Sequence, residues 1–288
     1  MKKRLLIIIL FFNFLAAFPQ HESDYWYFGF NAGMHFVSGT PVALTDGAMY
    51  TWEGCSALTN GNGDLMFYTD GRKVWNNTHQ VMPNGNGLLG DSSSTQSGMV
   101  VELPGVNKQY YLFTVDELGG ADGLRYSIID MNLDGGKGDI FQKNVALHNP
   151  VSEKISATFH SNNSNVWVLT HDWGSNAFYT YLVSPTGVDS TPVISNIGLP
   201  QSGGTLNSIG YMKFSPDGTK IALCVFGTGD IEIFDFDAST GIVSNPIIFP
   251  TQYSWAYSIE FSPDNSRLYV SQALIPRMLY QFNLNAGS

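Results

Sequence analysis

Acidic residues follow three successive strand-like segments at the same point of each, and they are the residues whose chemistry and spacing stand out. Asp70 ends Tyr-Thr-Asp, Asp116 ends Thr-Val-Asp and Asp172 ends Thr-His-Asp, while Asp230 lies a few residues beyond a fourth segment. Oxygen ligands from several carboxylates suit calcium, and a negative surface suits basic groups. The candidate ligand-binding face comprises Asp70, Asp116, Glu117, Glu153, His171, Asp172, Trp173 and Asp230.

Two interpretations of these acidic residues remain open. Asp side chains often cap the loop that follows a strand by accepting backbone N–H bonds, which would make their role structural. Alternatively, an acidic face with aromatic rims binds a divalent cation, a basic partner or a glycan. Asp70, Asp116 and Asp172 are the calcium candidates, and no other cofactor is expected. The connection 90–98 is expected to cover the same face.

Sequence signatures of catalysis are missing. The chain has no Gly-x-Ser-x-Gly elbow, no phosphate loop and no His-Glu-x-x-His motif. These absences favour a protein that binds over one that catalyses. A metal-assisted hydrolase, lyase or lactonase that uses the acidic face stays as the alternative, and no residue is assigned a catalytic role.

The elements that must position this face are indicated by an internal repeat. Lys213-Phe-Ser-Pro-Asp-Gly218 returns as Glu260-Phe-Ser-Pro-Asp-Asn265, so Ser215 and Ser262 lie 47 positions apart. Each copy joins two β-rich runs through a turn in which Pro, Asp and Gly or Asn supply the required backbone angles. A repeat of about 40–50 residues built from β-hairpins is typical of a propeller blade.

The spacing of strand-like runs extends this repeat over most of the chain. First strands of successive units begin near residues 55, 98, 154, 209 and 257, which predicts an all-β propeller of four-stranded antiparallel blades with about five visible. The segment 25–36 precedes them and is expected to add an outer strand that closes the ring. The fifth unit stops three strands in, so we expect the propeller over 21–288 to be truncated at its C-terminus.

Composition narrows the compartment and the partners. A basic start, an apolar run over residues 5–15 and small residues thereafter predict a cleaved signal peptide at 1–20, with no other transmembrane segment. A net charge of −10 and a pI near 4.8 argue against nucleic acid as a partner. Cys55 and Cys224 fall on separate blades, too far apart for a disulfide, and are expected to be free thiols.

Several motifs resemble a family of secreted Bacteroidetes proteins. They are Trp26-Tyr-Phe-Gly29, Leu65-Met-Phe-Tyr-Thr-Asp-Gly71 with Val74-Trp-Asn76, and Gly210-Tyr-Met-Lys-Phe-Ser-Pro-Asp-Gly218. The family has WD40/YVTN-like β-propellers, often followed by PKD modules and a gliding-motility-associated C-terminal sorting domain. The resemblance implies secretion by the type IX system and display at or release from the cell surface, and it does not itself imply an enzymatic activity.

Together these observations predict a secreted or cell-surface binding and adhesion module. The expected partner is an extracellular polysaccharide or protein, met through loops that vary on a constant scaffold.

Overall fold

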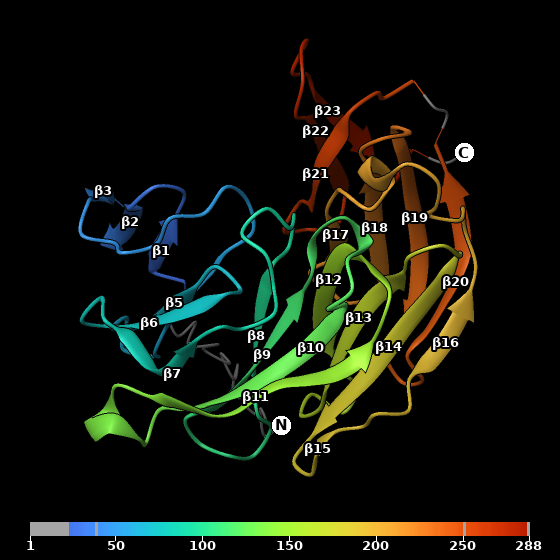
Figure 1. Ribbon diagram of the computed structural model, residues 1–288. Helices are drawn as coiled ribbons and strands as arrows, with labels where there is room; N and C mark the ends of the chain where they lie inside the picture. The colour runs from blue at the N-terminus through green and yellow to red at the C-terminus, as the bar shows by residue number, and fades with distance from the viewer. Residues whose placement is uncertain (1–22, 38–39, 250–251, 287–288) are drawn as a thin grey trace, which may run out of the picture.

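The computed structural model describes residues 23–37, 40–249 and 252–286, and nearly all of its regular structure is β. Six antiparallel sheets are arranged as the blades of a propeller (Figure 1). The all-β propeller is therefore confirmed, but the number of blades is six and not five, and the blades have three to five strands. The expected signal peptide lies outside the described residues, and no helix within them is long and apolar enough to cross a membrane.

The additional blade is built by the segment that was expected to close the ring. It folds on itself, because Gly29 and Asn31 take φ of +57° and +58° and allow a tight turn between its first two strands. Those strands pair locally, with Tyr27 opposite Gly33, so neither pairs with the far end of the chain. The first blade, blue in Figure 1, contains β1 (Tyr25–Phe28), β2 (Ala32–Val37) and β3 (Thr40–Leu44).

Blades two to four run outward from the propeller axis in chain order. The second contains β4 (Ser56–Thr59), β5 (Leu65–Thr69), β6 (Lys73–Asn76) and β7 (Val81–Asn86). The third contains β8 (Gly98–Glu102), β9 (Gln109–Val115), β10 (Leu124–Asp130) and β11 (Asp139–His148). The fourth contains β12 (Val151–Phe159), β13 (Val166–Asp172), β14 (Ala177–Ser184), β15 (Gly187–Val188) and β16 (Val193–Asn196). In the fourth, β15 and β16 both pair with β14, which gives this blade five strands.

The last two blades carry the repeat found in the sequence. The fifth contains β17 (Met212–Phe214), β18 (Lys220–Val225), β19 (Asp230–Asp237) and β20 (Ile242–Ile248). The sixth contains β21 (Ala256–Phe261), β22 (Arg267–Gln272) and β23 (Leu279–Asn283). Within the described residues three short 3-10 helices lie in loops: η1 (Glu117–Gly119), η2 (Asp134–Gly136) and η3 (Thr205–Asn207).

The repeated turns have the same hydrogen bonds. The hydroxyl of Ser215 donates to Asp217 over 2.6 Å, and that of Ser262 donates to Asp264 over 2.6 Å. Each aspartate also accepts a backbone N–H two residues later, at 3.1 Å in both turns. The residue directly after each aspartate has a positive φ, which is +69° at Gly218 and +59° at Asn265. The motif is therefore turn chemistry, as the sequence predicted.

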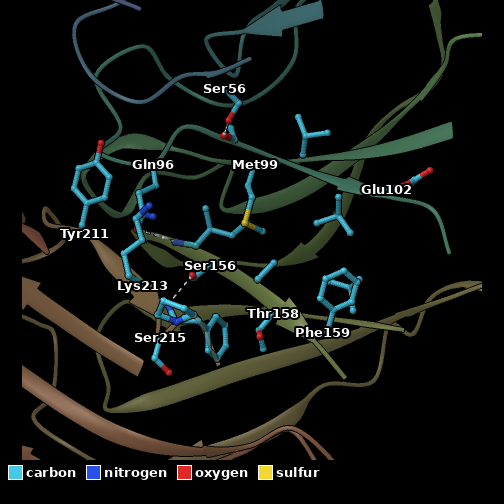
Figure 2. A pocket seen from close by; sticks show the side chains of 18 of the residues that line it. Ser56, Gln96, Met99, Glu102, Ser156, Thr158, Phe159, Tyr211, Lys213 and Ser215 are labelled. Atoms are coloured by element: carbon cyan, nitrogen blue, oxygen red, sulfur yellow. Dashed lines mark hydrogen bonds between the residues drawn. The ribbon is translucent and has the colours of Figure 1, made fainter. Parts of the chain in front are cut away.

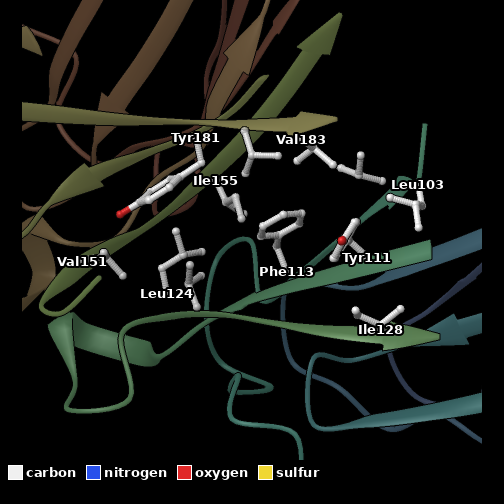
Figure 3. Packing of buried hydrophobic residues seen from close by; sticks show 12 residues of the cluster. Leu103, Tyr111, Phe113, Leu124, Ile128, Val151, Ile155, Tyr181 and Val183 are labelled. Carbon is white, nitrogen blue, oxygen red and sulfur yellow. The ribbon is translucent and has the colours of Figure 1, made fainter. Parts of the chain in front are cut away.

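Hydrophobic cores lie between neighbouring blades instead of at one centre. Figure 3 shows the cluster between the third and fourth blades, where Phe113, Leu124, Ile155 and Tyr181 are almost fully buried. Each buried side chain of this size contributes about 1.5–3 kcal/mol relative to an exposed one. Four further clusters join the other neighbouring blades. Cys55 and Cys224 are free thiols, as predicted.

Candidate functional site

The structure places the four aspartates of the candidate face where second strands end and third strands begin. Asp70 follows β5, Asp116 follows β9, Asp172 closes β13 and Asp230 opens β19. These positions belong to four different blades. What each carboxylate contacts decides whether it is available to a ligand.

Asp70 is bonded to its own loop. Its side chain is 1% exposed, and Oδ1 accepts the N–H groups of Arg72 and Lys73 over 2.9 and 2.8 Å. Its Oδ2 lies 3.2 Å from the Arg72 guanidinium. These contacts are those of a loop cap.

Asp116 and Asp230 are also bonded within their own loops, whereas Asp172 bonds both to its own loop and to the third blade. Asp116 accepts N–H groups of Glu117 and Asp122 over 2.9 and 3.0 Å. Asp172 contacts His148 Nε2 and Ser175 Oγ, both at 2.6 Å. Asp230 accepts the hydroxyl of Thr228 over 2.6 Å.

Metal binding on this face finds no donor set. Among residues 23–37, 40–249 and 252–286, no group of three or more His, Cys, Asp and Glu side chains is close enough to hold a metal ion. Asp70, Asp116 and Asp172 lie on three different blades and belong to no such group.

Glu153, the most deeply buried member of the face, belongs to a contact at the propeller axis. It lies on β12 and accepts the N–H and the hydroxyl of Thr95, both over 2.7 Å, and the N–H of Leu118 over 2.8 Å. Residues 90–98, called the plug below, therefore cover this face, as predicted. They also fill its centre.

The plug is bonded to four blades. Gln96 accepts the Met212 N–H over 2.9 Å and donates to the Met212 carbonyl over 3.1 Å. The hydroxyl of Ser97 donates to the carbonyls of Gly54 and Asp70, both over 2.7 Å. The absence of a side chain at Gly54 allows this approach, since a Cβ there would lie 2.3 Å from the Ser97 nitrogen.

The remaining members of the face contact neighbouring loops and strands. Trp173 packs its ring on Gly119 in η1. Burial lowers the pKa of His171 to about 3, and its Nδ1 contacts the Asp172 carbonyl, so the ring is neutral. Burial, followed by the charge of Asp91, raises the pKa of Glu117.

A cavity that the acidic face did not suggest lies along the propeller axis. Its volume is about 920 Å³, and it runs beside the innermost strands from the plug to the turns between first and second strands. Thr95 and Gln96 bound one end. The other end opens beside Glu102 and Phe159, whose side chain is 64% exposed. The cavity, called the central channel below, is thus closed on the acidic face and open on the opposite face.

The lining of the central channel mixes hydroxyl, amide, apolar and aromatic groups (Figure 2). Its charged pair is Lys213 with Glu260, 3.3 Å apart, and the Lys213 ammonium lies 5.9 Å from the centre of the Tyr211 ring. Burial raises the pKa of the Cys55 thiol to about 11, which makes it a poor nucleophile. The polar side chains labelled in Figure 2 include Ser56, Gln96, Ser156, Thr158 and Ser215.

The sequence contained one signal for this cavity. Innermost strands of a soluble propeller carry apolar side chains toward neighbouring blades, yet β12 ends Ser156-Ala-Thr158-Phe and β17 is preceded by Tyr211. Hydroxyl and aromatic side chains at these positions indicate a surface with polar groups, although the buried Ser156 hydroxyl also accepts the Phe214 N–H over 3.3 Å. The pattern of aspartates instead predicts a site on the opposite face of the propeller.

The comparisons with known proteins concern the fold. Neither a search of family models nor a search of curated proteins found a match. A candidate 6-phosphogluconolactonase from Bacteroides uniformis superposes with a TM-score of 0.52 at 15% identity, over 89% of this chain and 75% of that one. A second such protein, from Bacteroides fragilis, gives 0.52 at 14% identity, over 88% and 72%. A functionally unknown protein from Desulfotomaculum acetoxidans gives 0.51 at 13% identity, over 89% and 77%.

These values define the chain as a β-propeller. At identities of 13–15%, similarity of fold carries no assignment of activity.

Proposed function

We propose that this chain is an exported binding module whose central channel holds a sugar unit of an extracellular glycan. The observation that carries the proposal is the channel itself, a cavity of about 920 Å³ closed at one end by the plug. Concave sites of this size with a few well-placed polar groups are where proteins bind small ligands.

The channel lining fits a neutral, hydroxyl-rich ligand. Hydroxyl and amide side chains both donate and accept, as sugar hydroxyls do, and aromatic rings such as those of Tyr211 and Phe159 pack on apolar ring faces. Glu102 and Glu260 add two negative charges to the lining, and Lys213 compensates the charge of Glu260. The lining therefore disfavours anionic glycans.

Binding without turnover is supported by the reactive groups that line the channel. Among its described lining residues there is no histidine, and the one cysteine is protonated at neutral pH. A buried thiol and an exposed ion pair supply no activated nucleophile with an adjacent base.

Export and display at the cell surface form part of the proposal. They rest on the basic and apolar start of the sequence and on the resemblance to secreted Bacteroidetes propellers. Fractionating the native host and sequencing the mature N-terminus tests this part. A protein that keeps residues 1–20 inside the cell would contradict it.

The glycan site is tested by affinity electrophoresis in gels that contain laminarin, xylan, mannan or dextran, with alginate as the anionic comparison. We expect retardation by at least one neutral polymer and none by alginate. Replacing Phe159 with Ala should weaken binding about tenfold, equivalent to about 1.4 kcal/mol. Phe141→Ala, which removes a ring that is 54% exposed on β11, is the matched control. No retardation by any neutral polymer, or equal retardation of the Phe159 variant, would overturn the proposal.

A lactonase is the second candidate, favoured by the two candidate 6-phosphogluconolactonases of the same fold. The channel opposes a phosphorylated substrate, because Lys213 is the one cation among its described lining residues and it pairs with Glu260. An assay that measures the acid released on hydrolysis of gluconolactone and of its 6-phosphate distinguishes a lactonase from a binding module. Turnover above the uncatalysed rate that is lost in Glu102→Gln or Glu260→Gln would establish an enzyme.

A further inference from the structure

A second hollow lies beside the mouth of the central channel. Its volume is about 630 Å³, and it sits between the first-to-second-strand turns of the second and third blades. Asn60 and Asp64 line it from the second blade, and Asn107, Lys108 and Tyr110 line it from the third. Both hollows therefore open on the face opposite the plug.

The innermost strand of the third blade separates the two hollows. Side chains alternate along β8, so that Val100 packs toward the second blade and Met99 toward the fourth. Val100 and Glu102 line both hollows. Glu102 is exposed at the end of β8, where the two hollows meet.

We propose that these two hollows form one groove and that its ligand is a linear neutral oligosaccharide. This inference rests on the proposed function of the central channel. A terminal sugar occupies the channel, and the chain leaves by the mouth because the plug closes the other end. The next units cross Glu102 and lie in the second hollow.

The chemistry along this path suits a chain of hydroxyl groups. The carboxylate of Glu102 offers two acceptor oxygens at the crossing. Beyond it, the amide of Asn107 and the ammonium of Lys108 donate, and the Tyr110 ring offers an apolar face. An extended peptide that binds by β-augmentation would instead need a free strand edge for backbone pairing. A sugar chain needs only the polar side chains that line the groove.

The groove predicts that affinity depends on ligand length. The probes are the disaccharide and the hexasaccharide of β-1,3-linked glucose and of β-1,4-linked xylose, titrated by calorimetry. We expect the hexasaccharide of at least one series to bind about tenfold more tightly than its disaccharide. Asn107→Ala and Lys108→Met should weaken the hexasaccharide about tenfold and leave the disaccharide unchanged. Phe159→Ala should weaken both.

Both substitutions lie in an exposed turn, so each variant is expected to fold, and circular dichroism checks this. Lys73→Ala, an exposed lysine in the second blade, is the matched control. Equal affinity for the two lengths, or a hexasaccharide indifferent to Asn107 and Lys108, would overturn the groove while the channel site stands. No binding in either series, or displacement of bound hexasaccharide by an unrelated extended peptide, would overturn the groove as a glycan site.

Discussion

Glu153 on β12 accepts two 2.7 Å hydrogen bonds from Thr95, one from the backbone N–H and one from the hydroxyl. The Thr95 hydroxyl in turn accepts the N–H of Gly210 over 3.2 Å. One carboxylate thus ties the plug to the fourth blade, and the same threonine ties it to the segment that leads into the fifth.

Replacing Glu153 with Ala should therefore destabilise the protein strongly. The change leaves the buried N–H groups of Thr95 and Leu118 without their acceptor, and we expect a loss of about 3 kcal/mol in the free energy of unfolding. Urea denaturation measures this. Glu102→Gln, on an exposed side chain, should change the value by less than about 0.5 kcal/mol. Equal stability of Glu153→Ala and wild type would show that the plug does not depend on this contact.

Two carboxyl groups, one buried and one partly buried, should make stability depend on pH. Burial raises the pKa of Glu53 and of Glu232 to about 7, so the folded protein keeps protons that the unfolded chain releases above its ordinary pKa near 4.5. The stability that these groups contribute is present below pH 4.5 and is lost as the pH rises through 7. We expect the double variant Glu53→Gln, Glu232→Gln to gain stability relative to wild type as the pH rises from 5 to 8.

The comparison with wild type reports these two groups together with the coupling of Glu232 to Lys154. Burial lowers the pKa of His171 to about 3, so its ring is neutral in both proteins from pH 5 to 8, whereas the charge of Glu232 raises the pKa of Lys154 in wild type alone. Urea titrations at several pH values supply the free energies. A difference between the two proteins that stays constant from pH 5 to 8 would contradict the raised pKa values.

The thiols should react slowly in the folded protein. Burial raises the pKa of Cys55 to about 11 and that of Cys224 to about 12, and Cys224 Sγ donates to the Tyr257 carbonyl over 2.8 Å. At pH 8 iodoacetamide should label neither quickly, because the thiolate is the reactive form. Mass spectrometry before and after addition of guanidinium measures the labelling. Rapid modification of Cys224 without denaturant would mean that the fifth blade opens readily.

Calcium should have no specific effect through Asp70. Asp70→Ala removes the acceptor of two backbone N–H groups and should cost about 1–2 kcal/mol. We expect the same loss in Tm with calcium chloride and with EDTA. A calcium-dependent rise in the Tm of wild type that vanishes in Asp70→Ala would restore the cation site.

The propeller could be predicted from the sequence because its turns are local. Ser215 to Gly218 specifies a turn by the backbone angles of four neighbouring residues, and the second copy repeats it. The first blade could not be predicted in this way. The hairpin of β1 and β2 has no copy of the repeated turn, and it precedes the first strand-like run whose spacing matches the other units.

The central channel could not be predicted in the same way. Lys213 and Glu260 approach each other because the fifth and sixth blades place their innermost strands side by side, and no local sequence pattern specifies this packing of one blade on the next. The aspartates occupy equivalent positions in the repeat, but equivalent positions do not specify which hydrogen-bond donors each carboxylate contacts. Asp70 shows this, since its partners Arg72 and Lys73 lie within three residues of it.

The cores between the blades give the molecule a modular stability. Each cluster joins one blade to the next, so a cavity made at Phe113 weakens the boundary between the third and fourth blades and leaves distant boundaries intact. A chain of such boundaries would open one unit at a time. The plug works against this, because residues 90–98 bond to four blades at once. The plug therefore couples these four blades, so that they unfold cooperatively instead of one by one.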